Sequence, residues 1–218
     1  QERDQAPITA DLLRASESGE LVAAGTVGDA LGRETTEKDE PDTAGIAAFR
    51  IVGERACLDF AARGVRASVV RLAPTVHGPG DYGFIGMLIA TARKTGVSAY
   101  VGDGGNRWPA VHRLDAAILF RLALEKAPAG SVLHGVAESG VTMKSIAETI
   151  ARGLDLPAVS LTPDEAAANY ASPFMAAVYG FDAPVSSSYT QELLGWSPIH
   201  PALLEDLERG DYFAAPIS

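Results

Sequence analysis

The chain has 218 residues, of which 47% are hydrophobic, and a formal net charge of -10 at pH 7. This composition supports a large packed core, and the negative charge argues against nucleic acid or an anionic membrane surface as a partner. The single cysteine, Cys57, excludes an internal disulfide and a cysteine-based zinc site. Because the sequence shows neither a signal-peptide pattern nor a membrane-spanning run, we expect a cytoplasmic protein.

The first third of the chain predicts helices and strands in alternation. Residues 7–16 carry apolar side chains at helical spacing, and residues 19–27 form an apolar run that ends in a glycine turn. Residues 45–63 place an apolar stripe on one face of a helix. The polar, acid-rich stretch at 33–42 lies between the last two, and we expect a solvated surface loop there.

A buried strand followed by a shaped loop is predicted at residues 65–81. Residues 65–73 are nearly continuous in apolar and β-branched types, and prolines and glycines then interrupt the chain over 74–81. Gly64 stands where the preceding helix would end. Helix, glycine, strand and loop form one step of a doubly wound parallel α/β sheet, in which ligands bind beyond the carboxyl ends of the strands. The loop at 74–81 is therefore our first candidate for the wall of a site.

The rest of the chain continues the α/β alternation in shorter elements. Thr142 is the expected N-cap of the helix at 142–153. The expected helices are 84–95, 114–126, 142–153, one or two within 163–179, and 201–208; the expected strands are 97–102, 131–137 and 159–162, with 107–112 extended.

Three motifs stand in a fixed order along the chain: RLAPTVHGPGD at 71–81, GDGGNRWPAVHRLDAA at 102–117 and ELLGWSP at 192–198. Together they resemble the NAD-dependent epimerase/dehydratase family, the extended short-chain dehydrogenases/reductases. The resemblance implies a Rossmann-type parallel sheet that binds NAD or NADP, with a small C-terminal substrate lobe. On this basis residues 1–137 are the nucleotide domain, of which 78–112 contribute in part to the substrate lobe, and 138–218 are that lobe.

The chain departs from the family at its beginning. Members of the family open with a glycine-rich strand–turn–helix that holds the pyrophosphate, and this sequence has no such motif. The resemblance thus implies a sheet that is incomplete at its N-terminus. We expect a preceding segment of roughly a hundred residues, an ordinary domain-sized length, because the strand at 21–24 would otherwise be an uncovered edge.

A second departure concerns the proton-transfer residues. Ile46 and Arg50 stand where the resemblance places a Tyr and a Lys, and Ile46 cannot transfer a proton. Arg50 keeps a cation that suits a ribose or phosphate, although a surface helix charge is the alternative. Thr26 is the hydroxyl nearest to the position of the family's Ser or Thr, with turn chemistry as its alternative.

Residues 73–76 (Ala73, Pro74, Thr75 and Val76) resemble the segment that lies against the nicotinamide in the family. His77 replaces the family's usual Tyr, and a histidine side chain is a common proton donor, so His77 or Tyr82 is our candidate proton donor. A loop histidine bonded to backbone is the alternative. Arg107 and Trp108 are candidate substrate contacts, although Trp108 suits packing between lobes equally well.

These observations predict an NAD(P)-dependent oxidoreductase or epimerase that acts on a small carbonyl or hydroxyl substrate with an atypical acid/base set. Two alternatives stay open: a non-catalytic NAD(P)-binding or regulatory protein, and a fragment that binds no dinucleotide. We expect a small-molecule substrate, and a homodimer is one assembly that the sequence leaves open. No metal site is predicted, because neither His134 nor His200 has a ligand partner at metal spacing.

Overall fold

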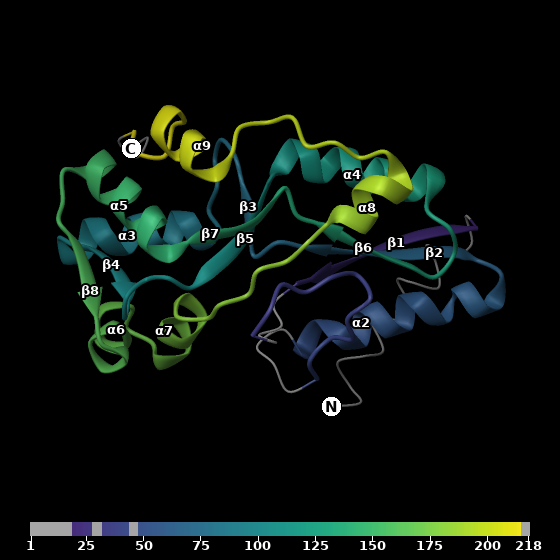
Figure 1. Cartoon of the computed structure of the whole chain (residues 1–218), viewed down its shortest axis with the longest axis horizontal. Coiled ribbons are helices and arrows are strands. Elements are labelled where there is room, and N and C mark those ends of the chain that lie inside the picture. Colours follow the sequence, from purple (N-terminus) through teal and green to yellow (C-terminus); the bar gives the residue numbers. More distant parts are fainter. Residues whose placement is uncertain (1–18, 28–31, 44–47, 215–218) are drawn as a thin grey trace.

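The computed structural model describes residues 19–27, 32–43 and 48–214. The helix expected at 7–16 lies outside these residues. One three-stranded sheet lies at one end of the described part, a second three-stranded sheet of shorter strands lies in the middle, and a two-stranded sheet lies at the other end (Figure 1). None of the described helices combines the length and hydropathy that crossing a bilayer requires.

The larger sheet is parallel and follows the order β1 (Glu20–Thr26), β2 (Arg66–Leu72) and β6 (Ser131–Gly135). Helix α2 (Ala48–Asp59) covers one face of this sheet and α4 (Arg113–Lys126) covers the other (Figure 1). The middle strand β2 is buried along most of its length, as its apolar sequence predicts. The doubly wound arrangement expected from the sequence is thereby confirmed.

The second sheet joins three short strands and positions the site. β3 (Thr75–His77) pairs in parallel with β5 (Arg107–His112), which pairs antiparallel with β7 (Glu138–Thr142). The sequence predicted only loop at β3, because three residues are too few to show a strand pattern. His77 lies opposite His112, so the residues that follow them leave the sheet at the same edge.

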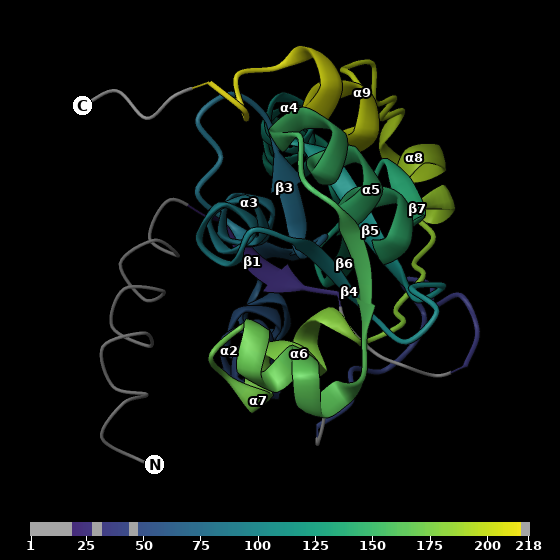
Figure 2. The same ribbon diagram turned by 90° about the vertical axis from the view of Figure 1, so that its left-hand side faces the viewer.

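The remaining elements surround a second core at the other end of the molecule. Strands β4 (Ser98–Val101) and β8 (Ala158–Leu161) pair in parallel, and Figure 2 shows helices α6 and α7 packed against β4. Thr142 caps α5 through its hydroxyl, as expected. The other helices are α3 (Phe84–Thr95), α5 (Met143–Leu154), α6 (Pro163–Asn169), α7 (Pro173–Tyr179), α8 (Ser188–Leu194) and α9 (Leu203–Arg209), with a 3-10 turn, η1 (Ala61–Arg63), after α2.

The acid-rich stretch at 33–42 is a solvated loop only in part, because it is exposed at 33, 34, 38, 40 and 42 but anchored between these positions. Thr35 and Glu37 are buried. The Thr35 N–H donates to the Pro184 carbonyl, and Glu37 Oε1 accepts from both the N–H and the hydroxyl of Thr190, at 2.9 and 2.6 Å. The stretch therefore fastens the start of α8 to the rest of the chain. Composition missed this because the partners lie about 150 residues further along, at a separation of 153 for Glu37 and Thr190.

Candidate functional site

A hollow of about 320 Å³ opens beside the loop that follows β3. The loop at 74–81 thus forms a wall of a hollow, as the Pro/Gly pattern predicted, and the first residue of α4 completes it. The residues lining the hollow are Val76, His77, Gly78, Gly80, Asp81, Tyr82, Gly83 and Arg113.

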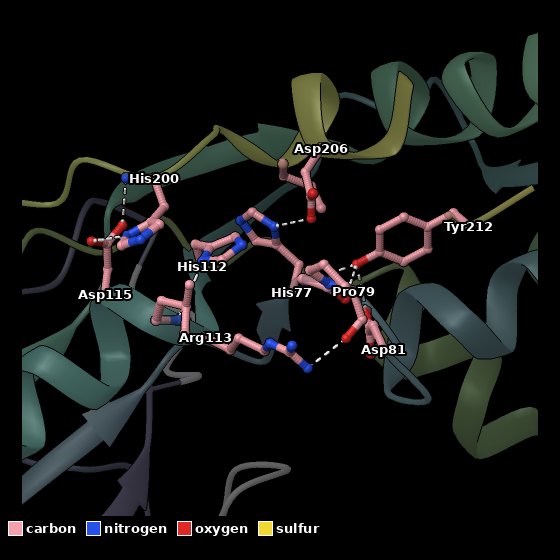
Figure 3. Close-up of polar contacts among 12 residues, drawn as sticks. His77, Pro79, Asp81, His112, Arg113, Asp115, His200, Asp206 and Tyr212 are labelled. Carbon is pink, nitrogen blue, oxygen red and sulfur yellow. Dashed lines mark hydrogen bonds and ion pairs between the residues drawn. The ribbon is translucent and has the colours of Figure 1, made fainter. Parts of the chain in front are cut away.

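The alternation of strand β3 decides which of its side chains face the hollow. Val76 is half-buried and lines the hollow, whereas the residues on either side of it, Thr75 and His77, are buried. The His77 side chain is only 1% exposed, and its Nδ1 lies 2.9 Å from Oδ2 of Asp206 on α9 (Figure 3). The imidazole of His77 is therefore held against the C-terminal helix.

A row of histidines continues from His77 toward α4. The His77 ring meets His112 edge-on, and His112 stacks on His200 with centroids 4.8 Å apart (Figure 3). His112 Nδ1 accepts from the Leu114 N–H and caps α4; burial, aided by His77, lowers the pKa of His112. Asp115 accepts from the His200 ring and N–H, and these bonds outweigh burial and lower its pKa. Buried carboxylates thus close both ends of the row.

The C-terminal segment also holds the loop next to Gly78. Gly78 N–H donates to the Tyr212 hydroxyl at 3.0 Å, and this hydroxyl lies 3.2 Å from Asp81 Oδ2 (Figure 3). Asp81 Oδ1 accepts from the Gly83 N–H. Burial raises the pKa of Asp81 and that of Tyr212. The shape of the loop therefore depends on residues more than 120 positions further along the chain.

Arg113 enters the hollow from the start of α4, and sequence reasoning missed it. Its Nη1 donates to the Pro79 carbonyl (Figure 3). Its aliphatic stem lies against Gly78, where an added Cβ would be 3.0 Å from Arg113 Cγ and Cδ. Gly78 has φ +141°, a conformation that other residues rarely adopt. Parallel pairing of β3 with β5 is the signal that would have found Arg113, because the residues after both strands share one edge.

Of the other predicted residues of the cofactor and acid/base set, only Tyr82 and Val76 line the hollow. Tyr82 is 95% exposed at the mouth of the hollow, and Thr26 is half-buried at the carboxyl end of β1. Arg50 lies exposed on α2. Ala73 and Thr75 are buried and Pro74 is half-buried; the Thr75 hydroxyl has no hydrogen-bond partner among the described residues.

The two predicted substrate contacts lie at the other end of β5. Arg107 is held by Asp182, whose oxygens accept from its Nε and Nη2 at 3.0 and 2.9 Å. Trp108 is 3% exposed, stacks on Tyr179 and donates from Nε1 to the Phe181 carbonyl at 3.0 Å. The structure thus places Trp108 in packing, the alternative named above, and neither residue lines the hollow.

Two curated proteins are similar in sequence to this chain. No family model matches it. It is 49% identical over 183 residues to the uncharacterized protein C2A9.02 of Schizosaccharomyces pombe, covering 84% of this chain and 60% of that protein. It is 44% identical over 164 residues to the uncharacterized protein YLL056C of Saccharomyces cerevisiae, covering 75% and 54%. The chain therefore spans little more than half the length of these relatives.

Several solved structures superpose on most of the chain. A dTDP-glucose 4,6-dehydratase from Streptomyces venezuelae with NAD bound has a TM-score of 0.71 at 15% identity, over 94% of this chain and 63% of that one. A UDP-galactose 4-epimerase has a TM-score of 0.70 at 20% identity, over 94% and 67%. The chain has the fold of these enzymes. The Rossmann-type architecture implied by the three motifs is confirmed at this level.

Proposed function

We propose that the chain is a member of the NAD-dependent epimerase/dehydratase family and an NAD(P)-dependent oxidoreductase or epimerase that acts on a small carbonyl or hydroxyl substrate. One observation carries the proposal. The loop that begins in β3 lines a hollow at the edge of a fold shared with enzymes solved with NAD. Val76 belongs both to this lining and to the segment 73–76, which the sequence likens to the nicotinamide-contacting segment. Substrates of open α/β folds bind at such strand ends.

The residues present fit the nicotinamide end of a dinucleotide. Arg50 would hold a ribose or phosphate, and residues 73–76 would lie against the ring. The Thr75 hydroxyl, buried and without a partner among the described residues, is a polar atom of the kind that a ligand satisfies. The described part of the chain holds no strand, glycine-rich turn and helix in succession, so the proposal assigns no pyrophosphate contact.

The dinucleotide supplies hydride exchange with a carbonyl or hydroxyl carbon when it is bound. The chain must then move a proton at the reacting oxygen. Tyr82 Oη stands at the mouth of the hollow, and Thr26 offers a hydroxyl at the end of β1. His77 is oriented by Asp206 at Nδ1, which leaves Nε2 as the atom that exchanges a proton. Because Ile46 replaces the family's Tyr, we expect slow turnover.

Binding of NADH and NADPH, followed by fluorescence, tests the cofactor assignment. Arg50→Ala should weaken binding by about 1–3 kcal/mol, the cost of a lost charge-assisted hydrogen bond. Arg55→Ala is the matched control, because Arg55 is exposed on the same helix and is assigned no contact. Equal affinities in both variants would remove Arg50 from the site, and no binding by the wild-type protein would reject the proposal.

Turnover of a carbonyl substrate, found in a screen, then shows whether Tyr82 or His77 is the proton donor. Turnover of Tyr82→Phe or His77→Gln should fall about a hundredfold or more if that residue supplies the proton. The free energy of unfolding of His77→Gln must be measured alongside, because His77 is buried on Asp206. Full turnover in both variants would place the donor elsewhere.

A second function, non-catalytic NAD(P) binding, is favoured by one specific observation. The only histidine at the hollow is buried and already paired with a carboxylate among the described residues, and the position of the family's Tyr holds Ile46. Dinucleotide binding without turnover of any screened carbonyl or alcohol would support this second function over the first.

A further inference from the structure

The charge on Arg113 is not matched by any carboxylate among the described residues. Several other arginines of this acidic chain pair with carboxylates, as Arg107 does with Asp182 and Arg71 with Glu54. Arg113 has one described partner, the neutral carbonyl of Pro79, and this bond uses only Nη1. Its Nε and Nη2 therefore keep donors for another molecule.

The two ionisable neighbours in the wall of the hollow are engaged in other contacts. Asp81 accepts from the Gly83 N–H with one oxygen and lies against the Tyr212 hydroxyl with the other. His77 is held by Asp206 through Nδ1 (Figure 3). The hollow thus presents a cation without a described counter-ion.

Two contacts orient the Arg113 side chain, which is exposed to solvent, before any ligand arrives. The glycine at 78 leaves space for the arginine stem, and the Pro79 carbonyl anchors one end of the guanidinium. A planar guanidinium held in place presents two parallel donors that match two oxygens of a carboxylate or phosphate. Holding it in advance lowers the entropy cost of binding.

We propose that Arg113 binds an anionic group of the substrate, a carboxylate or a phosphate, with two hydrogen bonds inside this hollow. The binding of an anion by Arg113 does not depend on the proposed function. Only the statement that this anion belongs to the substrate of an NAD(P)-dependent reaction rests on it. The volume of about 320 Å³ lies at the small end of ligand sites and suits a small organic acid or a small phosphate ester. Arg113, and not Arg107, is then the residue that selects the substrate.

Calorimetric titration of the purified protein with malonate, with inorganic phosphate and with neutral malonamide tests the proposal. Malonate or phosphate should bind and malonamide should not, and the stronger of the two anions identifies the group. Arg113→Gln should weaken anion binding by about tenfold or more, as loss of a charged hydrogen-bond pair does. Arg113→Lys keeps the charge without the fork and should fall between wild type and Arg113→Gln.

Arg121→Gln is the matched control, because Arg121 is exposed on the same helix and pairs with Glu125. Anion binding that is equal in wild type and Arg113→Gln, or absent from wild type, overturns the inference. If NADH binds while no anion does, the inference fails and the proposed function stands. If anions bind through Arg113 while no dinucleotide binds, the inference stands and the proposed function fails.

Discussion

Replacing Glu54 with alanine tests how far the placement of α2 depends on one buried ion pair. The side chains of Glu54 and Arg71 are 6% and 7% exposed. Arg71 Nε donates to the two carboxylate oxygens at 3.1 and 3.0 Å, and its Nη2 donates to Oε1. Arg71 Nη1 donates to the Asp39 carbonyl at 3.1 Å. The pair therefore joins α2, which carries Arg50, to the central strand β2.

In Glu54→Ala, the Arg71 guanidinium loses its carboxylate partner and keeps one described hydrogen bond, to the Asp39 carbonyl, at a position that is largely buried. Removing one partner of a buried pair costs about 3–5 kcal/mol, because the remaining charge is uncompensated. For a chain of this length each kcal/mol lowers Tm by roughly 2–4 °C, so Tm should fall by roughly 6–20 °C. Urea unfolding and a thermal scan, both followed by circular dichroism, measure the two quantities.

Two further variants show whether the unpaired charge is the cause. Glu54→Leu combined with Arg71→Met removes both charges and should recover most of the lost stability. Glu125→Ala breaks the exposed pair with Arg121 and should cost about 0.5 kcal/mol or less. The reasoning is refuted if Glu54→Ala costs under about 1 kcal/mol, or if the double variant is as unstable as the single one.

Two other predictions follow from the loop and the histidine row. Burial lowers the pKa of His112 in the folded chain below the ordinary histidine value of 6.5. As pH falls below 6.5, His112 therefore binds a proton in the unfolded chain more readily than in the folded chain. Stability should then fall by up to about 1.4 kcal/mol per pH unit for this one proton. His112→Asn keeps an N-cap for α4. In this variant the free energy of unfolding, measured by urea denaturation, should depend less on pH between pH 7 and 5.5 than in wild type. The same pH dependence in both proteins would contradict this prediction. Tyr212→Phe removes the acceptor of the Gly78 N–H and should cost about 1–3 kcal/mol of unfolding free energy. If the loop forms the site, Tyr212→Phe should also weaken malonate binding, whereas unchanged affinity would show that the loop holds its shape without Tyr212.

The long apolar elements could be predicted from sequence because their formation requires only burial against other apolar side chains and no specific partner residue. β2 needs only burial on both faces, and α3 was predicted with the bounds that the structure has, Phe84–Thr95. β3 and β7 were missed, since a strand of three residues and the polar ESGVT carry no periodicity. Their pairing is set by β5, which lies between them.

The sequence motif and the hollow point to arginines at opposite ends of the same strand as the substrate-binding cation. Arg107 and His112 bound the six-residue strand β5, so these ends are about 17 Å apart at 3.3–3.4 Å per residue. The sequence motif singled out Arg107, whereas the hollow adjoins the edge where β3 and β5 both end. Only a residue just past His112 reaches that edge, and Arg113 is that residue.

The histidine at the site was visible in the sequence, but its surroundings were not. His77 stands in a loop motif that predicted a residue facing the cofactor, and the alternation of β3 instead turns its ring toward α9. Its partner Asp206 lies 129 residues away, in a helix that no local pattern connects to this loop. Contacts with His77 and Gly78 couple the site to the C-terminal segment. A change at Asp206 in α9 acts on His77 directly, and a change at Tyr212 acts through Gly78 on Arg113, whose stem lies against that glycine.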